Sequence, residues 1–199
     1  MIPQRKADRR RELLRRRRVR SDADRSAGAA ALAAGLPGVL DAVAGAVCLH
    51  VPAGSEPGRA PDGAVPLLDA ARALGHRVLL PVTVGDAPLD WAEYRDPGDL
   101  VPGPFGLVEP AGERLGPHVV GEADVVVVPA LAADRSGTRL GRGGGHYDRS
   151  LPLAAGARLI ALVYDDELVD PLPVEPHDVR VHAVWRPRGG VLAVGPGTP

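Results

Sequence analysis

Residues 124–149 read DVVVVPALAADRSGTRLGRGGGHYDR, and this stretch decides the fold of the chain. The four valines at 125–128 are typical of a strand that is buried on both faces. Pro129 ends the run because proline cannot donate to the hydrogen-bond ladder of a sheet. The three glycines at 143–145 precede a predicted helix, and without a Cβ their backbone N–H groups can approach a bound anion. Surrounded by arginines at 139, 142 and 149, the segment predicts a phosphate-binding loop, although a bare glycine run also fits a flexible turn.

The apolar runs of the remaining sequence are short and alternate with helical stretches. Further strands are predicted at 46–51, 78–82, 159–164 and 181–185, and helices at roughly 5–20, 22–34, 37–45 and 64–75. This alternation predicts a three-layer α/β fold, a mainly parallel sheet with helices on both faces. Ligands of such sheets bind beyond the carboxyl ends of the strands. We expect a single domain over residues 1–188 and a frayed tail over residues 189–199.

Charge is unevenly distributed along the chain. The net charge is −1, yet residues 5–20 carry ten positive and two negative side chains, which leaves about −9 for the rest. The four arginines at 15–18 are compatible with nucleic-acid binding. Aromatic residues make up only 3% of the chain and none lies in the basic segment to stack on bases. We therefore expect no nucleic-acid partner.

The remaining composition indicates the cellular location of the protein. No segment approaches the roughly 18 apolar residues of a membrane span, and no apolar stretch follows the basic start. The single cysteine, Cys48, lies in an apolar run, which favours a buried hydrophobic role over a nucleophilic one. These features predict a cytoplasmic protein without a membrane partner, and we expect a monomer.

Lys6 is the only lysine among the 24 lysine and arginine residues. It lies four positions before Arg10 on a predicted helix, so both side chains share a face and can reach one bound group. An ammonium group is a compact point charge that suits a triphosphate. The alternative is a solvated basic helix in which the lysine has no special role.

The glycine loop matches neither of the common nucleotide motifs. The Walker A pattern does not occur, and His146 stands where the dinucleotide motif requires its third glycine. The run from Gly137 to Arg149, with its G-x-R-L-G-x-G-G-G-x-Y-D-R pattern, instead resembles the signature of the 5-formyltetrahydrofolate cyclo-ligase family. The resemblance extends to the basic N-terminal helix, a Glu before a helix, an EP dipeptide and an HD dipeptide. His146 replaces the first of two tyrosines that the family usually has.

This resemblance implies ATP-dependent cyclisation of 5-formyltetrahydrofolate to 5,10-methenyltetrahydrofolate, with release of ADP and phosphate. Phosphorylation of the formyl oxygen would activate it, and positioning and charge neutralisation would suffice without a protein nucleophile. By the same resemblance, Arg142 and Tyr147 are the expected catalytic residues. The expected ATP-binding residues are Lys6, Arg10, Arg139, Gly141, Arg142, Gly143, Gly144, Gly145, His146 and Tyr147.

The folate and magnesium sites follow from the same resemblance. The expected folate-binding residues are Glu56, Phe105, Trp91 and Tyr147, although core packing is the alternative for each apolar side chain. Asp148 and Asp178 are the expected Mg²⁺ ligands, since Mg²⁺ prefers carboxylates together with phosphate oxygens.

Several of these residues also fit simpler structural roles. Either aspartate is a plausible helix or turn cap, and the pair at 165–166 is a rival metal site that a surface turn accounts for equally well. A non-catalytic nucleotide- or anion-binding regulatory module is the alternative function.

Overall fold

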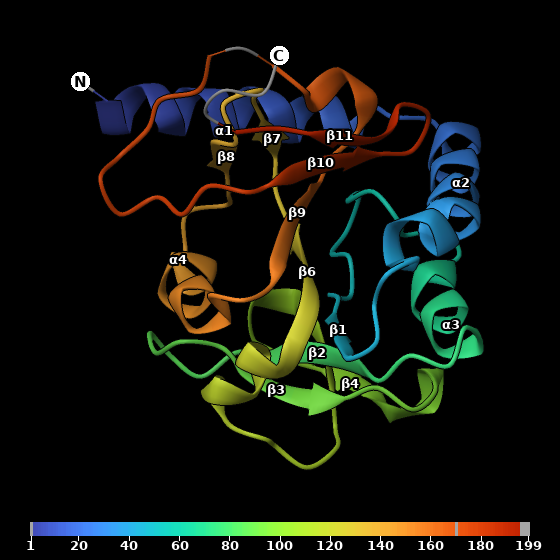
Figure 1. Ribbon diagram of the computed structural model, residues 1–199. Helices are drawn as coiled ribbons and strands as arrows, with labels where there is room; N and C mark the ends of the chain where they lie inside the picture. Colours follow the sequence, from blue (N-terminus) through green and yellow to red (C-terminus); the bar gives the residue numbers. More distant parts are fainter. Residues whose placement is uncertain (1, 170, 196–199) are drawn as a thin grey trace.

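The computed structural model describes residues 2–169 and 171–195, with side chains from residue 6 onward. Its centre is a seven-stranded sheet in the order β11-β10-β9-β6-β1-β2-β3 (Figure 1). The five inner strands are parallel, and the edge strands β3 and β11 pair antiparallel with their neighbours. The sheet strands are β1 (Ala46–Cys48), β2 (Val78–Val82), β3 (Asp90–Glu93), β6 (Ala123–Pro129), β9 (Arg158–Leu162), β10 (Ala183–Arg186) and β11 (Gly190–Ala193).

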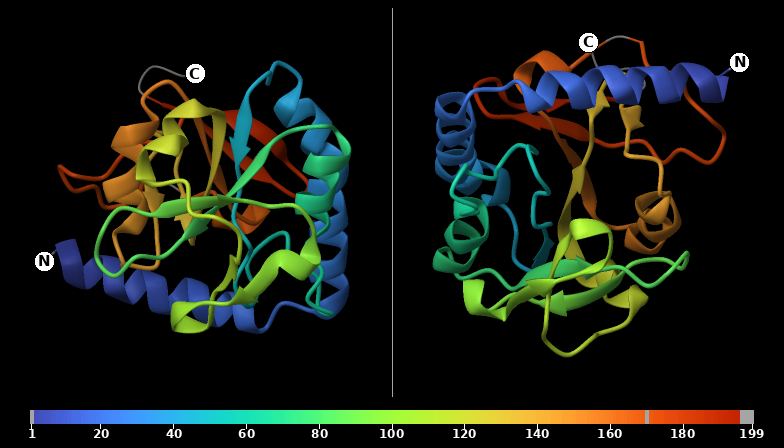
Figure 2. Two further views of the ribbon diagram at one scale, coloured as in Figure 1. Left: turned by 90° about the horizontal axis from the view of Figure 1, so that it is seen from below. Right: turned by 180° about the vertical axis from the view of Figure 1, so that it is seen from behind.

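Helices cover both faces of this sheet, as the sequence predicts. On one side lie α2 (Asp22–Leu40) and α3 (Pro66–Ala73), and on the other α4 (His146–Ser150) with the 3-10 helices Pro117–Glu122 and Leu151–Ala154 (Figures 1 and 2). Strand β6 shows why two layers form. Val125 and Val127 enter the core under α2 and α3, whereas Val126 and Val128 enter the opposite core. The predicted doubly buried strand and the three-layer α/β class are confirmed.

The long helix α1 (Ile2–Arg18) lies across the carboxyl end of the sheet (Figure 2). Its Leu13 packs with Leu131 and Leu140 in a third apolar cluster. The partners come from the hairpin of β7 (Ala132–Ala133) and β8 (Arg139–Leu140). A second hairpin joins β4 (Leu100–Pro102) and β5 (Val108–Pro110). No helix in residues 2–169 and 171–195 is long and apolar enough to cross a membrane.

The predicted helix at 37–45 is wrong as a separate element. Helix α2 continues through Pro37 to Leu40, and residues 41–45 form a turn whose Ala44 and Gly45 N–H groups donate to the Asp124 carboxylate. A proline inside a helix removes one backbone hydrogen bond. Here Leu36, Val39 and Leu40 are all buried in the core, and their burial outweighs that loss.

The frayed tail expected at 189–199 is also wrong in part. Residues 190–193 form β11, which pairs with β10 through a tight turn between Arg186 and Gly190. This strand is short and only partly buried, so its sequence carries little periodic signal and only the pairing reveals it. Residues 196–199 of the expected tail lie outside the described residues.

Candidate active site

A cleft of about 310 Å³ opens at the carboxyl ends of β1 and β6, where the parallel topology places ligand sites. Its walls come from α1, the loop after β1, the β4–β5 hairpin, the glycine loop with α4, and the segment at 175–178. Residues far apart in the chain therefore share one cavity. Most of the predicted site residues line it: Lys6, Arg10, Glu56, Arg139, Gly141, Arg142, Gly143, Gly144, Gly145, His146, Tyr147, Asp148 and Asp178.

The glycine loop connects β8 to α4. Gly143 and Gly145 have positive φ angles of 108° and 68°, a conformation that L side chains rarely adopt. At Gly144 an added Cβ would lie 2.9 Å from Nδ1 of His146. The loop thus requires glycine for both its backbone path and its space, and it presents main chain rather than side chain to the cleft.

Two arginines meet this loop, each with a polar partner. Arg10 donates through Nε to the Gly141 carbonyl at 2.9 Å. Arg139 is buried and donates to Oδ1 of Asp148 at 2.7 Å. Burial lowers the pKa of Arg139, and the charges of Asp148 and Asp178 oppose that effect. Asp148 therefore pairs directly with Arg139, whereas Asp178 affects this guanidinium only through its charge.

Lys6 is almost fully buried and bridges two acidic side chains. Its Nζ lies 2.6 Å from Oε2 of Glu175 and 2.7 Å from Oδ2 of Asp178. Burial lowers the pKa of Lys6, but hydrogen bonds to Asp178 and Glu175 outweigh burial and raise it above the ordinary value. The alternative of a solvated basic helix is wrong for this residue.

Glu175, His177 and Asp178 offer ligand atoms within 4.8 Å of one another, a grouping that can hold a metal ion. Sequence reasoning named only Asp178 of this group. Glu175 lies three residues earlier in the same EPHD segment, and its backbone N–H donates to the Asp178 carboxylate. The HD dipeptide could have pointed to all of residues 175–178 as a candidate metal-binding turn.

Glu56 lies opposite the glycine loop with its side chain buried. Its Oε2 accepts from the Ala53 N–H at 2.8 Å and its Oε1 accepts from Nε of Arg142 at 2.9 Å. Arg142 itself is half exposed at the rim. This ion pair joins the expected folate wall to the expected phosphate loop.

Two residues that line this cleft carry a buried polar group without a partner among the described residues. The hydroxyl of Tyr147 is one, and burial raises the pKa of Tyr147, so the phenol is neutral. Nδ1 of His50, two residues beyond β1, is the other, and burial lowers the pKa of that ring. Sequence reasoning missed His50, although its place near the carboxyl end of the strand predicted at 46–51 put it close to the ligand-binding edge.

The structure contradicts the expected folate contacts of Phe105 and Trp91, because neither residue lines the cleft. Phe105 is 84% exposed at the tip of the β4–β5 hairpin, with a φ of 58°. Trp91 lies in β3, and the alternation of that strand turns its ring into the core. Leu89, Leu107, Val108 and the buried Glu109 line the cleft instead. Glu109 belongs to the EP dipeptide, which was the available signal.

His146 donates through Nε2 to the carbonyl of Gly85 at 2.9 Å, because a carbonyl can only accept. This bond ties the start of α4 to the loop between β2 and β3. The ring therefore has a structural partner even though the residue lines the cleft.

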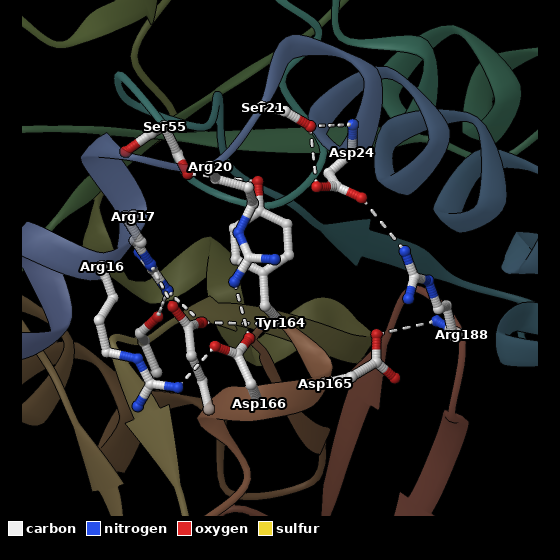
Figure 3. A network of polar contacts seen from close by, with 12 residues as sticks. Arg16, Arg17, Arg20, Ser21, Asp24, Ser55, Tyr164, Asp165, Asp166 and Arg188 are labelled. Atoms are coloured by element: carbon white, nitrogen blue, oxygen red, sulfur yellow. Dashed lines mark hydrogen bonds and ion pairs between the residues drawn. The ribbon is translucent and has the colours of Figure 1, made fainter.

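The acidic pair at 165–166, the rival metal site, is held by contacts away from the cleft. Asp166 pairs with Arg16 and Arg20, and Asp165 accepts from the backbone N–H of Arg188 (Figure 3). The backbone N–H of Gly189 also donates to Asp165. The four-arginine run is likewise divided, since Arg17 is buried in an ion pair with Glu167. Surface-turn and structural roles therefore account for these charges.

Comparison with known proteins gives a consistent result. The model of the 5-formyltetrahydrofolate cyclo-ligase family matches residues 2–187. A 5-formyltetrahydrofolate cyclo-ligase of Mycolicibacterium smegmatis is 49% identical over 98% of this chain and 100% of its own. That of Escherichia coli (strain K12) is 33% identical over 61% of this chain and 69% of its own.

The same fold occurs among solved structures. The NMR structure of Aquifex aeolicus 5,10-methenyltetrahydrofolate synthetase superposes with a TM-score of 0.78 at 25% identity, covering 98% of this chain and 95% of that one. A 5,10-methenyltetrahydrofolate synthetase from Mycoplasma pneumoniae has a TM-score of 0.69 at 18% identity, covering 90% and 96%, and supports the fold alone.

Proposed function

Because this chain belongs to the 5-formyltetrahydrofolate cyclo-ligase family, we propose that it cyclises 5-formyltetrahydrofolate to 5,10-methenyltetrahydrofolate with consumption of ATP. One observation carries the proposal. The cationic glycine loop and the buried carboxylate of Glu56 lie in one cleft, joined by the Arg142–Glu56 ion pair at 2.9 Å. A phosphoryl donor and a folate bound on these two walls would lie side by side, as transfer between them requires.

When bound, ATP supplies the γ-phosphoryl group that makes the formyl oxygen a leaving group, and ADP is released. The bridging nitrogen of the substrate then attacks the formyl carbon and loses its proton to solvent, and the phosphorylated oxygen departs as phosphate. In this proposal Arg139 and Arg142 neutralise charge that develops on the transferred group. Arg142 and Tyr147 are the residues assigned to the reaction, and no protein nucleophile is required.

Lys6, Arg10 and the glycine loop would hold the phosphates, with Glu56 and Tyr147 on the folate side. Tyr147 lines the cleft close to the glycine loop, which supports its assignment. His50 and Glu109 extend the folate wall by position. Phe105 and Trp91 have no part in this proposal.

The residues present fit a magnesium ion. Asp148, Glu175 and Asp178 offer hard carboxylate oxygens in the same cleft as the glycine loop, the donor type that Mg²⁺ shares with phosphates. Asp148 and Asp178 both line this cleft, one beside the glycine loop and the other in the segment at 175–178. We propose that these aspartates bind Mg²⁺, which would offset phosphate charge. Asp148→Asn should then raise the magnesium concentration needed to bind ATP, measured by calorimetry.

The test of function is a direct assay. Mixing the protein with ATP, Mg²⁺ and 5-formyltetrahydrofolate should increase the absorbance of the methenyl product, and omitting ATP should abolish that increase. Arg142→Lys keeps the charge but loses the planar fork, so its turnover should fall sharply. If ATP binds and no product forms at saturating substrate, the alternative of a non-catalytic nucleotide-binding module is correct.

The proposal also covers the domain organisation, the oligomeric state and the cellular location of the enzyme. The family match over residues 2–187 supports the single domain expected over residues 1–188, and the continuous sheet extends it to β11 at Gly190–Ala193. We propose a cytoplasmic monomer. Burial of Cys48 raises the pKa of its thiol to about 12, which keeps it inert and supports its predicted hydrophobic role. Size-exclusion chromatography with light scattering tests the oligomeric state.

A further inference from the structure

The loop that carries Glu56 has an unusual set of backbone contacts. Four consecutive carbonyls, at residues 52–55, each accept from a long side chain, and these donors come from different parts of the fold. The bonds are Arg59 to Pro52 (3.3 Å), Arg142 to Ala53 (3.4 Å), Arg25 to Gly54 (3.5 Å) and Tyr164 to Ser55 (3.3 Å). The loop belongs to no strand or helix here, and these side chains fix its path together with the bond from the Glu56 N–H to the Ala53 carbonyl at 3.1 Å.

Tyr164 differs from the other three donors because it is itself held on several sides. Its backbone N–H donates to Oε2 of Glu167 at 2.8 Å, and the guanidinium of Arg20 lies 3.8 Å from its ring centroid (Figure 3). The residue is only 3% exposed. A phenol has two side-chain torsions, whereas an arginine has four, so Tyr164 offers its donor in one direction.

The same residues connect this donor to helix α1. Glu167 forms a two-point ion pair with Arg17, which also donates to the carbonyl of Ala130 on the cleft wall. Arg17 lies two helical turns beyond Arg10, on the helix that also carries Lys6. One buried network therefore touches both the basic helix and the Glu56 loop.

We infer that Tyr164 is a positioning residue for Glu56: its hydroxyl fixes the Ser55 carbonyl and so aims the adjacent Glu56 carboxylate into the cleft. The inference depends on the proposed folate-binding role of Glu56. Burial raises the pKa of Tyr164, so its hydroxyl remains a donor throughout the neutral range. The effect should appear in substrate binding rather than in the chemical step.

The experiment uses Tyr164→Phe, which removes one hydroxyl and keeps the ring, its burial and the Arg20 contact. We expect KM and Kd for 5-formyltetrahydrofolate to rise roughly two- to tenfold, the range for loss of one neutral hydrogen bond. KM for ATP and kcat should stay close to wild type. Kd is measured by calorimetry without ATP, so it is independent of turnover.

Tyr94→Phe is the matched control. Tyr94 is equally buried, and its hydroxyl donates to Asp69 at 2.8 Å away from the cleft. This variant should leave the folate Kd unchanged. In a Glu56→Gln background, Tyr164→Phe should have no further effect on Kd if it acts through the carboxylate.

Two results would overturn the inference. One is a folate Kd of Tyr164→Phe equal to that of wild type. The other is the same fold loss with and without the Glu56 carboxylate, which would mean a general change in the cleft. Failure of the proposed function looks different, because the wild-type protein would then form no methenyl product or bind no folate.

Discussion

Arg17 provides the most demanding test of how the basic helix is held. Its side chain is 1% exposed and donates to both carboxylate oxygens of Glu167 at 2.7 Å. A third bond goes to the Ala130 carbonyl at 2.5 Å, and Glu167 also accepts from the Tyr164 N–H. Replacing Arg17 by methionine keeps an unbranched apolar stem and removes every one of its side-chain hydrogen bonds. Glu167 is then left as a buried carboxylate without its cation.

The expected loss is large because the remaining charge is desolvated. Removing one partner of a buried ion pair destabilises a protein by about 3–5 kcal/mol. For a chain of this length each 1 kcal/mol lowers Tm by roughly 2–4 °C, which predicts a decrease of roughly 6–20 °C. Replacing both partners with apolar residues should recover much of the loss, since no charge is then stranded.

Urea unfolding followed by circular dichroism measures the free energy of unfolding of wild type, Arg17→Met and Arg17→Met/Glu167→Met. The matched control is Arg16→Met, one residue away, whose partner Asp166 has a side chain that is 41% exposed. An exposed pair contributes at most about 1 kcal/mol. If Arg17→Met loses no more stability than Arg16→Met, or the double variant is less stable than the single one, the reasoning is wrong.

The other predictions concern the cleft. Lys6→Met should weaken ATP binding with little change in folate binding, and calorimetric titration with both ligands checks this. The pKa of Asp178 is lowered, since the Lys6 hydrogen bond outweighs the opposing effect of burial. The stability that Lys6 adds through Asp178 should therefore be present above about pH 4 and lost as pH falls through the lowered pKa of Asp178. Measuring the free energy of unfolding of wild type and Lys6→Met as a function of acid pH tests this. Phe105→Ala should leave the folate Kd unchanged whereas Leu107→Ala should raise it, since only Leu107 lines the cleft.

The sequence by itself determined the features that depend on local chemistry. Four consecutive valines favour a strand covered on both faces, and Pro129 ends β6 as predicted. The glycines of residues 141–145 require a loop, and the helix that follows it was predicted as well. Cys48 is buried as its apolar neighbours indicated. In each case the deciding interactions lie within a few residues.

The partners of the charged groups were decided only by the tertiary structure. Lys6 meets Asp178 across 172 positions of sequence, and Glu56 meets Arg142 across 86. No periodic pattern encodes such pairs, because they arise where the crossover topology brings strand ends together. The orientations of Trp91 and Phe105 were equally out of reach, since they depend on strand register and on one left-handed backbone conformation. The local sequence pattern determines where helices and strands form, and the packing of the sheet determines which side chains line the cleft.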